Sequence, residues 1–168
     1  ELVWENTEAM SGFEFDRQGN LRMATRETDD GGTEFFRVEG KDLVSVYTVT
    51  NEEQAYIVRF HKDGKRAYMV TNKGDDVDLS RLVFFDPETG KTELIESDPE
   101  KEVDFGGAMF SRKTDELLAT TYEGARVRIY WKNKDFEKAY KKLKKELKKE
   151  IGEGDLYVTS STNDDRYH

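Results

Sequence analysis

Apolar and polar residues alternate along several short stretches of the chain, and the same arrangement returns three times. The stretches FEFDRQGNLRMATRET, YIVRFHKDGKRAYMVTN and AMFSRKTDELLATTY each contain an alternating run, a polar turn and a second alternating run. Alternation with a period of two residues places the apolar side chains on one face of a β-strand. The three stretches therefore predict three β-hairpins.

The hairpins recur at a regular spacing. When the residue before each turn is aligned, Phe15, Phe60 and Phe110 lie 45 and 50 residues apart, and Ser160 follows after another 50 residues. Periods in this range are typical of propellers and solenoids. The spacing thus indicates an array of similar units, with a fourth unit beginning near Ser160.

Further strands are predicted after each hairpin. TEFFRV, RLVFFD and RVRIYW follow as third strands, and LVSVYT and TELIES follow as fourth strands in the first two units. Gly19 and Gly64 can take the positive φ of a tight hairpin, and Asp86-Pro87 with Gly90 suits a tight turn before TELIES. Units of four antiparallel strands are typical of β-propeller blades, whereas a meandering β-sandwich is the alternative. A sandwich gives no reason for the same turn to recur in each unit, so the repeat favours the propeller.

We therefore predict an all-β fold, a partial β-propeller, in a single domain over residues 1–168. Blade one covers about residues 10–49, blade two about 55–97 and blade three about 103–151, and the next blade starts at about 155–168. Leu156 to Ser160 is interpreted as the first strand of that next blade, because a TNDD turn follows it as in the other units.

A helix is predicted near residues 135–151, inserted where the third blade would place its fourth strand. Phe136, Tyr140, Leu143, Leu147 and Ile151 follow one another at spacings of 4, 3, 4 and 4, which is one helical stripe. Asn133 or Asp135 can cap the start of the helix, and Gly152 ends it.

The same helix is rich in lysine. Residues 132–149 contain nine Lys, against four acidic residues between 135 and 150. A basic helix for a membrane or a nucleic acid is one interpretation. A solvated outer face is the favoured interpretation, because the apolar stripe is narrow and Lys commonly fills exposed helix positions.

Composition and charge limit the classes of partner. The chain has 35% hydrophobic, 38% charged and 12% aromatic residues and a formal net charge of −9, which argues against a general nucleic-acid binder. It contains no Cys, so disulfides and thiolate chemistry are excluded. No apolar run is long enough for a membrane helix, and the first residues lack a signal-peptide pattern. The chain opens on Glu1 in mid-pattern, so we expect a piece excised from a longer protein. The sequence leaves the compartment open between cytoplasm and periplasm.

The order of several pieces resembles a known family. These pieces are YMVTNKGDD, LVFFDPETGKTELI, VDFGGAMFSRKTDELLATTY, the helical WKNKDFEKAYKKLKKEL and LYVTSSTNDD. Together they resemble the N-terminal β-propeller of bacterial serine peptidases of the prolyl oligopeptidase family, in the acylaminoacyl-peptidase-like branch. The resemblance covers nearly the whole chain, although the loop NKGDDVD is about two residues longer than the family pattern.

The resemblance implies a non-catalytic role. In that family the propeller limits the access of peptides to an α/β-hydrolase domain that carries the catalytic triad. This chain has no G-x-S-x-G, and His61 and His168 are its only histidines, so we assign it no catalytic, cofactor-binding or metal-binding residue and no cofactor. The expected partners are the missing blades, the hydrolase domain and the parent's peptide substrates, without nucleic acid or membrane. The alternative is a stand-alone TolB-like propeller segment that acts as a binding or scaffolding module.

Other candidate chemistry is weaker. Asp75, Asp76 and Asp78 form an acidic loop, with Asp29 and Asp30 at the equivalent place one blade earlier, and clustered oxygens suit calcium. The spacing is not that of an EF-hand, so a solvated loop is favoured over a cation-binding module. Glu146 and Glu150 are expected on the wet side of the helix, and His61 in an exposed turn. The aromatic residues of the third strands are interpreted as the packing layer between blades: Phe35, Phe36, Phe84, Phe85, Tyr130 and Trp131.

The blade count has a physical consequence. Propeller blades bury both faces against their neighbours, so three blades without a closed ring leave two outer faces bare. We therefore expect self-association through the end blades, reduced where the helix covers one of these faces.

Overall fold

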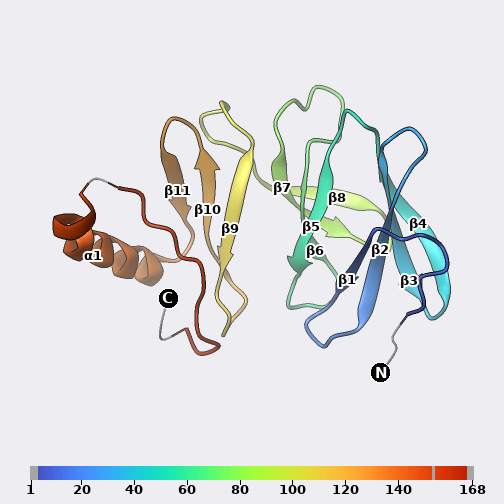
Figure 1. Cartoon of the computed structure of the whole chain (residues 1–168), viewed down its shortest axis with the longest axis horizontal. Coiled ribbons are helices and arrows are strands. Elements are labelled where there is room, and N and C mark those ends of the chain that lie inside the picture. Colours follow the sequence, from blue (N-terminus) through green and yellow to red (C-terminus); the bar gives the residue numbers. More distant parts are fainter. Residues whose placement is uncertain (1–3, 153, 166–168) are drawn as a thin grey trace. The chain divides into compact units, whose positions relative to one another are not determined.

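A computed structural model describes residues 4–152 and 154–165 of the chain. It contains three antiparallel sheets of four, four and three strands and one C-terminal helix (Figure 1). The chain divides into two compact units, Glu1–Phe105 and Gly106–His168, which are called unit 1 and unit 2. Each unit is described by itself.

Unit 1 holds the first two sheets. Sheet 1 contains β1 (Gly12–Phe15), β2 (Leu21–Glu27), β3 (Thr33–Glu39) and β4 (Asp42–Val49), and sheet 2 contains β5 (Ala55–Phe60), β6 (Ala67–Thr71), β7 (Arg81–Asp86) and β8 (Lys91–Glu96). In each sheet the strands pair antiparallel in chain order, β1-β2-β3-β4 and β5-β6-β7-β8. The predicted pair of four-stranded meanders is confirmed, with boundaries that differ by one or two residues.

One apolar layer joins sheet 1 to sheet 2. Met23, Phe35 and Val49 from sheet 1 lie in the same buried cluster as six residues of sheet 2: Ile57, Phe60, Ala67, Met69, Val83 and Phe85. Tyr47 lies between the two sheets, with its ring centroid 5.9 Å from that of Phe35 and 5.4 Å from that of Phe85. Period-two alternation explains this arrangement, because Ala67 and Met69, or Val83 and Phe85, share one face of their strand.

The opposite face of sheet 1 carries a second, smaller cluster. Ala24 and Phe36, which alternate with Met23 and Phe35 along β2 and β3, pack there with Met10. Asn6 holds Met10 in place, because its side chain accepts from the N–H of Met10 at 2.8 Å and donates to the carbonyl of Met10 at 2.9 Å. The expectation of a bare outer face is therefore wrong for this part of sheet 1, where the chain before β1 covers the strands.

The recurring hairpin turns share a similar pattern of backbone hydrogen bonds. Asp16 and His61 open the first turn of each sheet, and their N–H groups donate to the carbonyls of Asn20 at 2.9 Å and Arg66 at 2.8 Å. Gly19 and Gly64 donate back to the carbonyls of Asp16 and His61, both at 3.0 Å. Their φ angles are 83° and 67°, as predicted for a tight turn at glycine.

Gly90 links the last turn of sheet 2 to sheet 1. Its φ is 68°, and its N–H donates to the carbonyl of Asp86 at 2.8 Å. A Cβ atom at this position would lie 2.2 Å from the carbonyl oxygen of Val46 in β4. Glycine is therefore required here both by the backbone conformation and by the close approach of the two sheets.

Unit 2 contains the third sheet, except for Phe105, the first residue of its first strand. Here β9 (Phe105–Phe110), β10 (Leu117–Glu123) and β11 (Val127–Trp131) pair in the order β11-β10-β9. The turn between β9 and β10 repeats the pattern of unit 1, because the N–H of Ser111 donates to the carbonyl of Glu116 at 2.9 Å. The sheet has three strands and is followed by the helix, so the predicted replacement of a fourth strand by a helix near residues 135–151 is confirmed.

The helix α1 (Lys134–Ile151) begins at Asn133, whose side-chain oxygen accepts from the N–H groups of Asp135 and Phe136 at 3.0 Å. Its first half packs on β11, because the ring centroid of Trp131 lies 5.8 Å from Phe136 and 4.8 Å from Tyr140. Leu143, which belongs to the predicted apolar stripe, is 39% exposed. The helix is thus anchored at its start, and the lysine-rich remainder is solvated.

Residues 154–162 form no strand, so the predicted strand Leu156–Ser160 is wrong. The predicted turn after it is present at residues 163–165. A strand requires a neighbouring strand to pair with, and among the described residues this segment joins none of the three sheets. The segment is held by side-chain contacts instead, including the hydrogen bond from the Tyr140 hydroxyl to the carbonyl of Leu156 at 2.6 Å.

The described residues form three sheets and no closed ring of sheets. The mainly-β class, the repeated meander and the single helix are therefore established.

Candidate functional site

His61 is less exposed than the sequence suggested. Its side chain is 16% exposed, and its ring packs edge-on against Tyr68 and Phe84, with centroids 5.7 Å and 5.4 Å apart. Its Nδ1 lies 2.8 Å from Oδ2 of Asp63, two residues further along the same turn. His61 therefore belongs to the structure of the hairpin, on the face of sheet 2 opposite the shared apolar layer.

Asp63 closes the same hairpin. Its carboxylate accepts from the N–H groups of Lys65 at 2.8 Å and Arg66 at 3.0 Å and from Nε of Arg66 at 2.9 Å. Burial opposes its negative charge, but these hydrogen bonds and the one with His61 outweigh burial and hold the pKa of Asp63 well below its usual range. The turn thus carries a fixed negative charge whose acceptor sites are occupied by its own chain.

Arg22 reaches from sheet 1 to this turn. Its Nη1 donates to the carbonyl of Gly64 at 2.6 Å and lies 3.4 Å from Oδ2 of Asp16. Its guanidinium lies over the ring of Phe60, 5.2 Å from the centroid. The first hairpins of the two sheets are therefore fixed to one another at the same end of unit 1.

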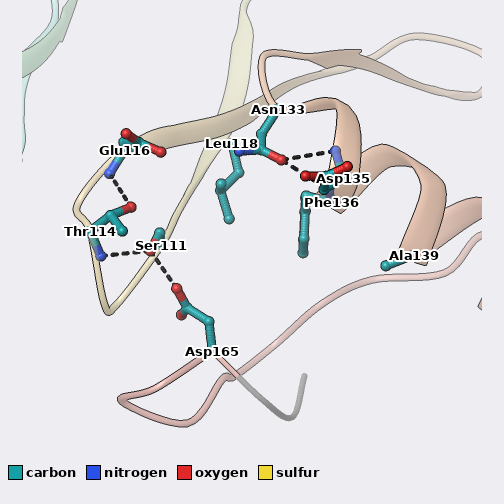
Figure 2. A pocket seen from close by; sticks show the side chains of 9 residues that line it. All are labelled: Ser111, Thr114, Glu116, Leu118, Asn133, Asp135, Phe136, Ala139 and Asp165. Carbon is teal, nitrogen blue, oxygen red and sulfur yellow. Dashed lines mark hydrogen bonds between the residues drawn. The ribbon is translucent and has the colours of Figure 1, made fainter.

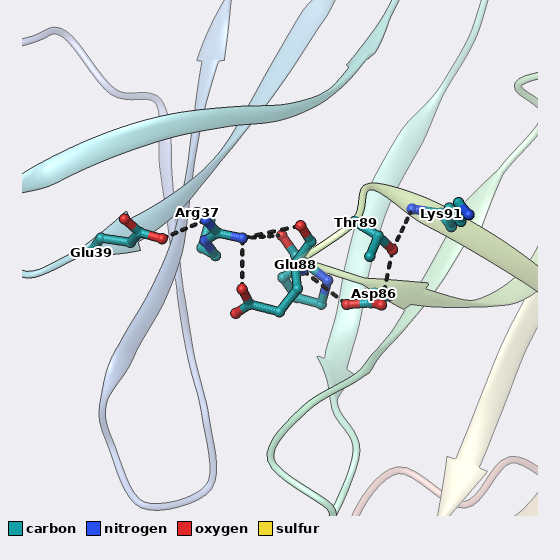
Figure 3. A network of polar contacts seen from close by, with 7 residues as sticks. Arg37, Glu39, Asp86, Glu88, Thr89 and Lys91 are labelled. Carbon is teal, nitrogen blue, oxygen red and sulfur yellow. Dashed lines mark hydrogen bonds and ion pairs between the residues drawn. The ribbon is translucent and has the colours of Figure 1, made fainter.

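A second arginine makes a parallel link one strand further out. Nη1 of Arg37 in β3 donates to the carbonyl of Glu88 at 3.2 Å and to its Oε2 at 2.8 Å, in the turn between β7 and β8 (Figure 3). Its Nη2 pairs with Glu39. Asp86 shapes this turn by accepting from the N–H of Glu88 and the hydroxyl of Thr89, both at 2.9 Å.

These turns surround a hollow of about 560 Å³. Its lining combines three cationic and three carboxylate side chains: Arg22, Lys65, Arg66, Asp63, Asp86 and Glu88. Sheet 1 contributes Arg22 from β2, and sheet 2 contributes the turn between β5 and β6 and the turn between β7 and β8. Its volume lies within the range of small-ligand sites.

Unit 2 has a smaller pocket of about 300 Å³ beside the start of α1. Figure 2 shows its lining residues: Ser111, Thr114, Glu116, Leu118, Asn133, Asp135, Phe136, Ala139 and Asp165. Leu118 and Phe136 give it an apolar side, whereas Glu116, Asp135 and Asp165 place carboxylates around it. Such a lining suits a neutral or cationic group better than an anion.

Asp165 closes one side of this pocket by binding the turn between β9 and β10. Its carboxylate accepts from the hydroxyl of Ser111 and from the N–H groups of Arg112 at 2.9 Å and Lys113 at 3.3 Å. In unit 1 the equivalent turns are closed by Asp16 and Asp63 of the same hairpin. In unit 2 the closing carboxylate comes instead from 54 residues further along the chain.

The acidic residues singled out in the sequence are not brought together. Asp75, Asp76 and Asp78 are all exposed, as are Asp29 and Asp30 in the equivalent loop. Within residues 4–152 and 154–165, no group of three His, Cys, Asp or Glu side chains is placed to hold a metal ion. Glu146 and Glu150 are exposed on α1, and His168 lies outside the described residues.

The predicted aromatic packing layer is correct only in part. Phe35 and Phe85 lie in the layer between sheets 1 and 2. Phe36 packs instead on the opposite face of sheet 1, and Phe84 packs beside Tyr68 with the guanidinium of Arg66 at 4.2 Å. In unit 2 the ring of Tyr130 lies 5.6 Å from that of Tyr122, and Trp131 contacts the helix. Adjacent aromatic residues on a strand point to opposite faces, so one pair cannot fill one layer.

Sequence reasoning missed Arg22, Arg37 and Asp165. Arg22 follows the DRQGN turn at a position where arginine reads as an ordinary exposed strand residue, and its partner Gly64 is 42 residues away. A local signal was available only for the aspartates of the turns, Asp16, Asp63 and Asp86, because Asp and Asn in turns commonly accept from the backbone two residues ahead.

Among the described residues, no helix is long and apolar enough to cross a membrane. Comparison of the chain with protein families, with curated proteins and with solved structures finds no match.

Proposed function

We propose that this chain is a non-catalytic segment of a β-propeller, which in a larger serine peptidase limits the access of substrates to a separate hydrolase domain. The observation that supports the propeller is the stacking of two successive four-stranded meanders through one apolar layer, which includes Met23 and Phe35 on one side and Met69 and Phe85 on the other. Propeller blades pack on their neighbours in this manner.

The neighbouring turns are consistent with this packing. Arg22 and Arg37 both cross from sheet 1 to turns of sheet 2, so that the two sheets are joined at one end as well as through the apolar layer. A module built in this way presents a rigid rim of turns, and such a rim can restrict the passage of a substrate without acting on it.

The peptidase part of the proposal depends on the resemblance of the ordered sequence pieces to the prolyl oligopeptidase family. The experiment is to read the coding sequence beyond residue 168 and to label the full-length product with a fluorophosphonate probe. A downstream G-x-S-x-G followed by Asp and His, with labelling at that serine, supports the proposal. Further blades followed by a stop codon, with no labelling, would instead identify a stand-alone TolB-like binding or scaffolding segment.

A further inference from the structure

In the hollow formed by the turns of unit 1, the hydrogen-bond acceptors of the described residues are occupied, whereas many of their donors are free. Its three carboxylates are already engaged. Asp63 accepts from Lys65, Arg66 and His61, and Asp86 accepts from Glu88 and Thr89. Glu88 is paired with Arg37 (Figure 3). These contacts shape the two turns or link them to sheet 1, so the carboxylates are committed to the structure.

The three cations of the hollow retain most of their donors. Arg66 uses Nε for Asp63, and Arg22 uses Nη1 for Gly64 and Asp16. In the part of the chain that the structure describes, the remaining N–H groups of both guanidinium ions have no hydrogen-bond partner, and neither has Nζ of Lys65. An arginine has five N–H donors in a fixed fork, so each retains enough donors to bind an oxyanion at two points.

Both guanidinium ions are also held in position. Arg66 lies on the ring of Phe84 at 4.2 Å, and Arg22 lies over Phe60 at 5.2 Å. A hydrogen bond fixes each of them a second time: Arg66 donates to Asp63 in its own turn, and Arg22 donates to the carbonyl of Gly64 in the turn of the neighbouring sheet. A ligand therefore does not have to order these side chains, which lowers the entropic cost of binding.

The basic residues of the hollow stand out from the acidic composition of unit 1. Residues 1–105 contain 25 acidic and 13 basic residues, a formal charge of −12. Three of the basic residues line this one hollow, where the acidic side chains are occupied by internal donors. An anion repelled by most of the unit would find unoccupied donors here.

From this geometry we propose that the hollow binds a small oxyanion, a phosphate or carboxylate group, between the guanidinium ions of Arg22 and Arg66 and the ammonium group of Lys65. Asp63, Asp86 and Glu88 line the same hollow, and their negative charges weaken the attraction of the anion. The site lies wholly within unit 1 and does not depend on the presence of a hydrolase domain.

The proposal is tested by NMR on the whole chain labelled with ¹⁵N. Sodium phosphate and, in a separate arm, sodium acetate are titrated at constant ionic strength while the Arg Nε–Hε resonances are followed. Saturable shifts of Arg22 and Arg66 in either arm support the site, and the arm that responds identifies phosphate or carboxylate as its ligand class. The absence of a saturable shift in both arms overturns the proposal.

A matched pair of variants separates a site from a general charge effect. Lys65 and Lys62 are both exposed and lie in the same turn, but only Lys65 lines the hollow. Lys65→Gln is expected to weaken binding about five-fold, the effect of one exposed charge-assisted hydrogen bond, whereas Lys62→Gln leaves it unchanged. Equal weakening by the two variants would show that the anion responds only to the net charge and would contradict the proposal.

Discussion

The carboxylate of Asp165 accepts the hydroxyl hydrogen bond of Ser111 and closes a turn that lies 54 residues earlier in the chain. The same carboxylate receives the N–H groups of Arg112 and Lys113. Residues 154–162 form no helix or strand, and residues 163–165 form a turn. The contact of Asp165 with Ser111 and the hydrogen bond from Tyr140 to Leu156 therefore fix this segment on unit 2.

Removing the charge of Asp165 should release this segment. Asp165→Ala is expected to cost roughly 1–3 kcal/mol locally, because three donors lose their acceptor. Hydrogen exchange at the amides of Arg112 and Lys113 should become faster while the circular dichroism of the sheets is unchanged. Glu123→Ala is the control, because Glu123 is exposed at the end of β10. Unchanged exchange in Asp165→Ala would show that the contact does not hold the turn.

Asp63 predicts a specific dependence of stability on pH. Its pKa is lower in the folded chain than its usual value of 3.8, so its carboxylate stabilises the fold above that value, and the contribution is lost as the pH falls through the folded pKa. Asp63→Asn should therefore be less stable than the original chain at pH 7, by about 1–2 kcal/mol, and the difference should shrink in acid.

Denaturant unfolding at pH values from 7 down to 2 measures this difference. Asp29→Asn is the control, because Asp29 is exposed in a loop of sheet 1. Stability curves for Asp63→Asn and the original chain that stay parallel throughout would contradict the assigned role of the carboxylate.

Two halves of α1 should respond differently to substitution. Tyr140 is 7% exposed and packs on Trp131, so Tyr140→Ala is expected to cost about 2–4 kcal/mol and to undock the helix. Leu143→Gln, three residues further on at a side chain that is 39% exposed, should change stability by less than about 0.5 kcal/mol. Trp fluorescence and the helical circular dichroism signal report both outcomes. Equal losses of stability in the two variants would contradict the assignment of the contact with β11 to the first half of the helix.

Two glycines with similar backbone conformations provide a test of the contact between sheets 1 and 2. Gly90 and Gly40 have φ angles of 68° and 63°, but a Cβ meets the Val46 carbonyl oxygen at 2.2 Å only at Gly90. Gly40→Ala should cost about 1 kcal/mol for the left-handed conformation alone, and Gly90→Ala should cost more than about 3 kcal/mol. Thermal unfolding compares the two. Similar losses would mean that the β7–β8 turn does not approach β4 as closely as described.

Self-association remains a prediction from the open array of sheets. Leu94 on β8 is 55% exposed, and an exposed edge strand with an apolar side chain favours pairing between chains. Light scattering should give a mass above 19.5 kDa that rises with concentration, and Leu94→Glu should lower it. A constant monomer mass at high concentration would contradict this expectation.

The sequence predicted the local structure well because that structure depends on neighbours along the chain. Alternation located the strands, Gly19 and Gly64 located the turns, and Asn133, one of the two candidates for the helix cap, is the cap. The unsuccessful predictions involve partners that are distant in sequence. Leu156 to Ser160 has the alternation of a strand, but a strand also needs a neighbouring ladder, and no local pattern reveals whether one is present.

The candidate site was less predictable for the same reason. No local pattern distinguishes Arg22, Lys65 or Arg66 from other polar residues. They come together only because the fold places the side chain of Arg22, from β2, on the turn between β5 and β6. His61 was placed correctly in a turn, but Tyr68 and Phe84, which shield its ring, belong to the next two strands.

The carboxylate that accepts from each hairpin turn comes from the same hairpin in unit 1 but from a distant residue in unit 2. This difference affects when each turn can be completed during synthesis on the ribosome. The turns at Asp16 and Asp63 contain their own acceptor and can close as soon as each hairpin has been synthesised. The turn at Ser111 has local backbone hydrogen bonds, but the carboxylate that accepts from it belongs to residue 165, and at typical translation rates 54 further residues take roughly 3 to 10 seconds. Until residue 165 has been synthesised, the N–H groups of Arg112 and Lys113 lack the acceptor that Asp165 provides in the finished chain.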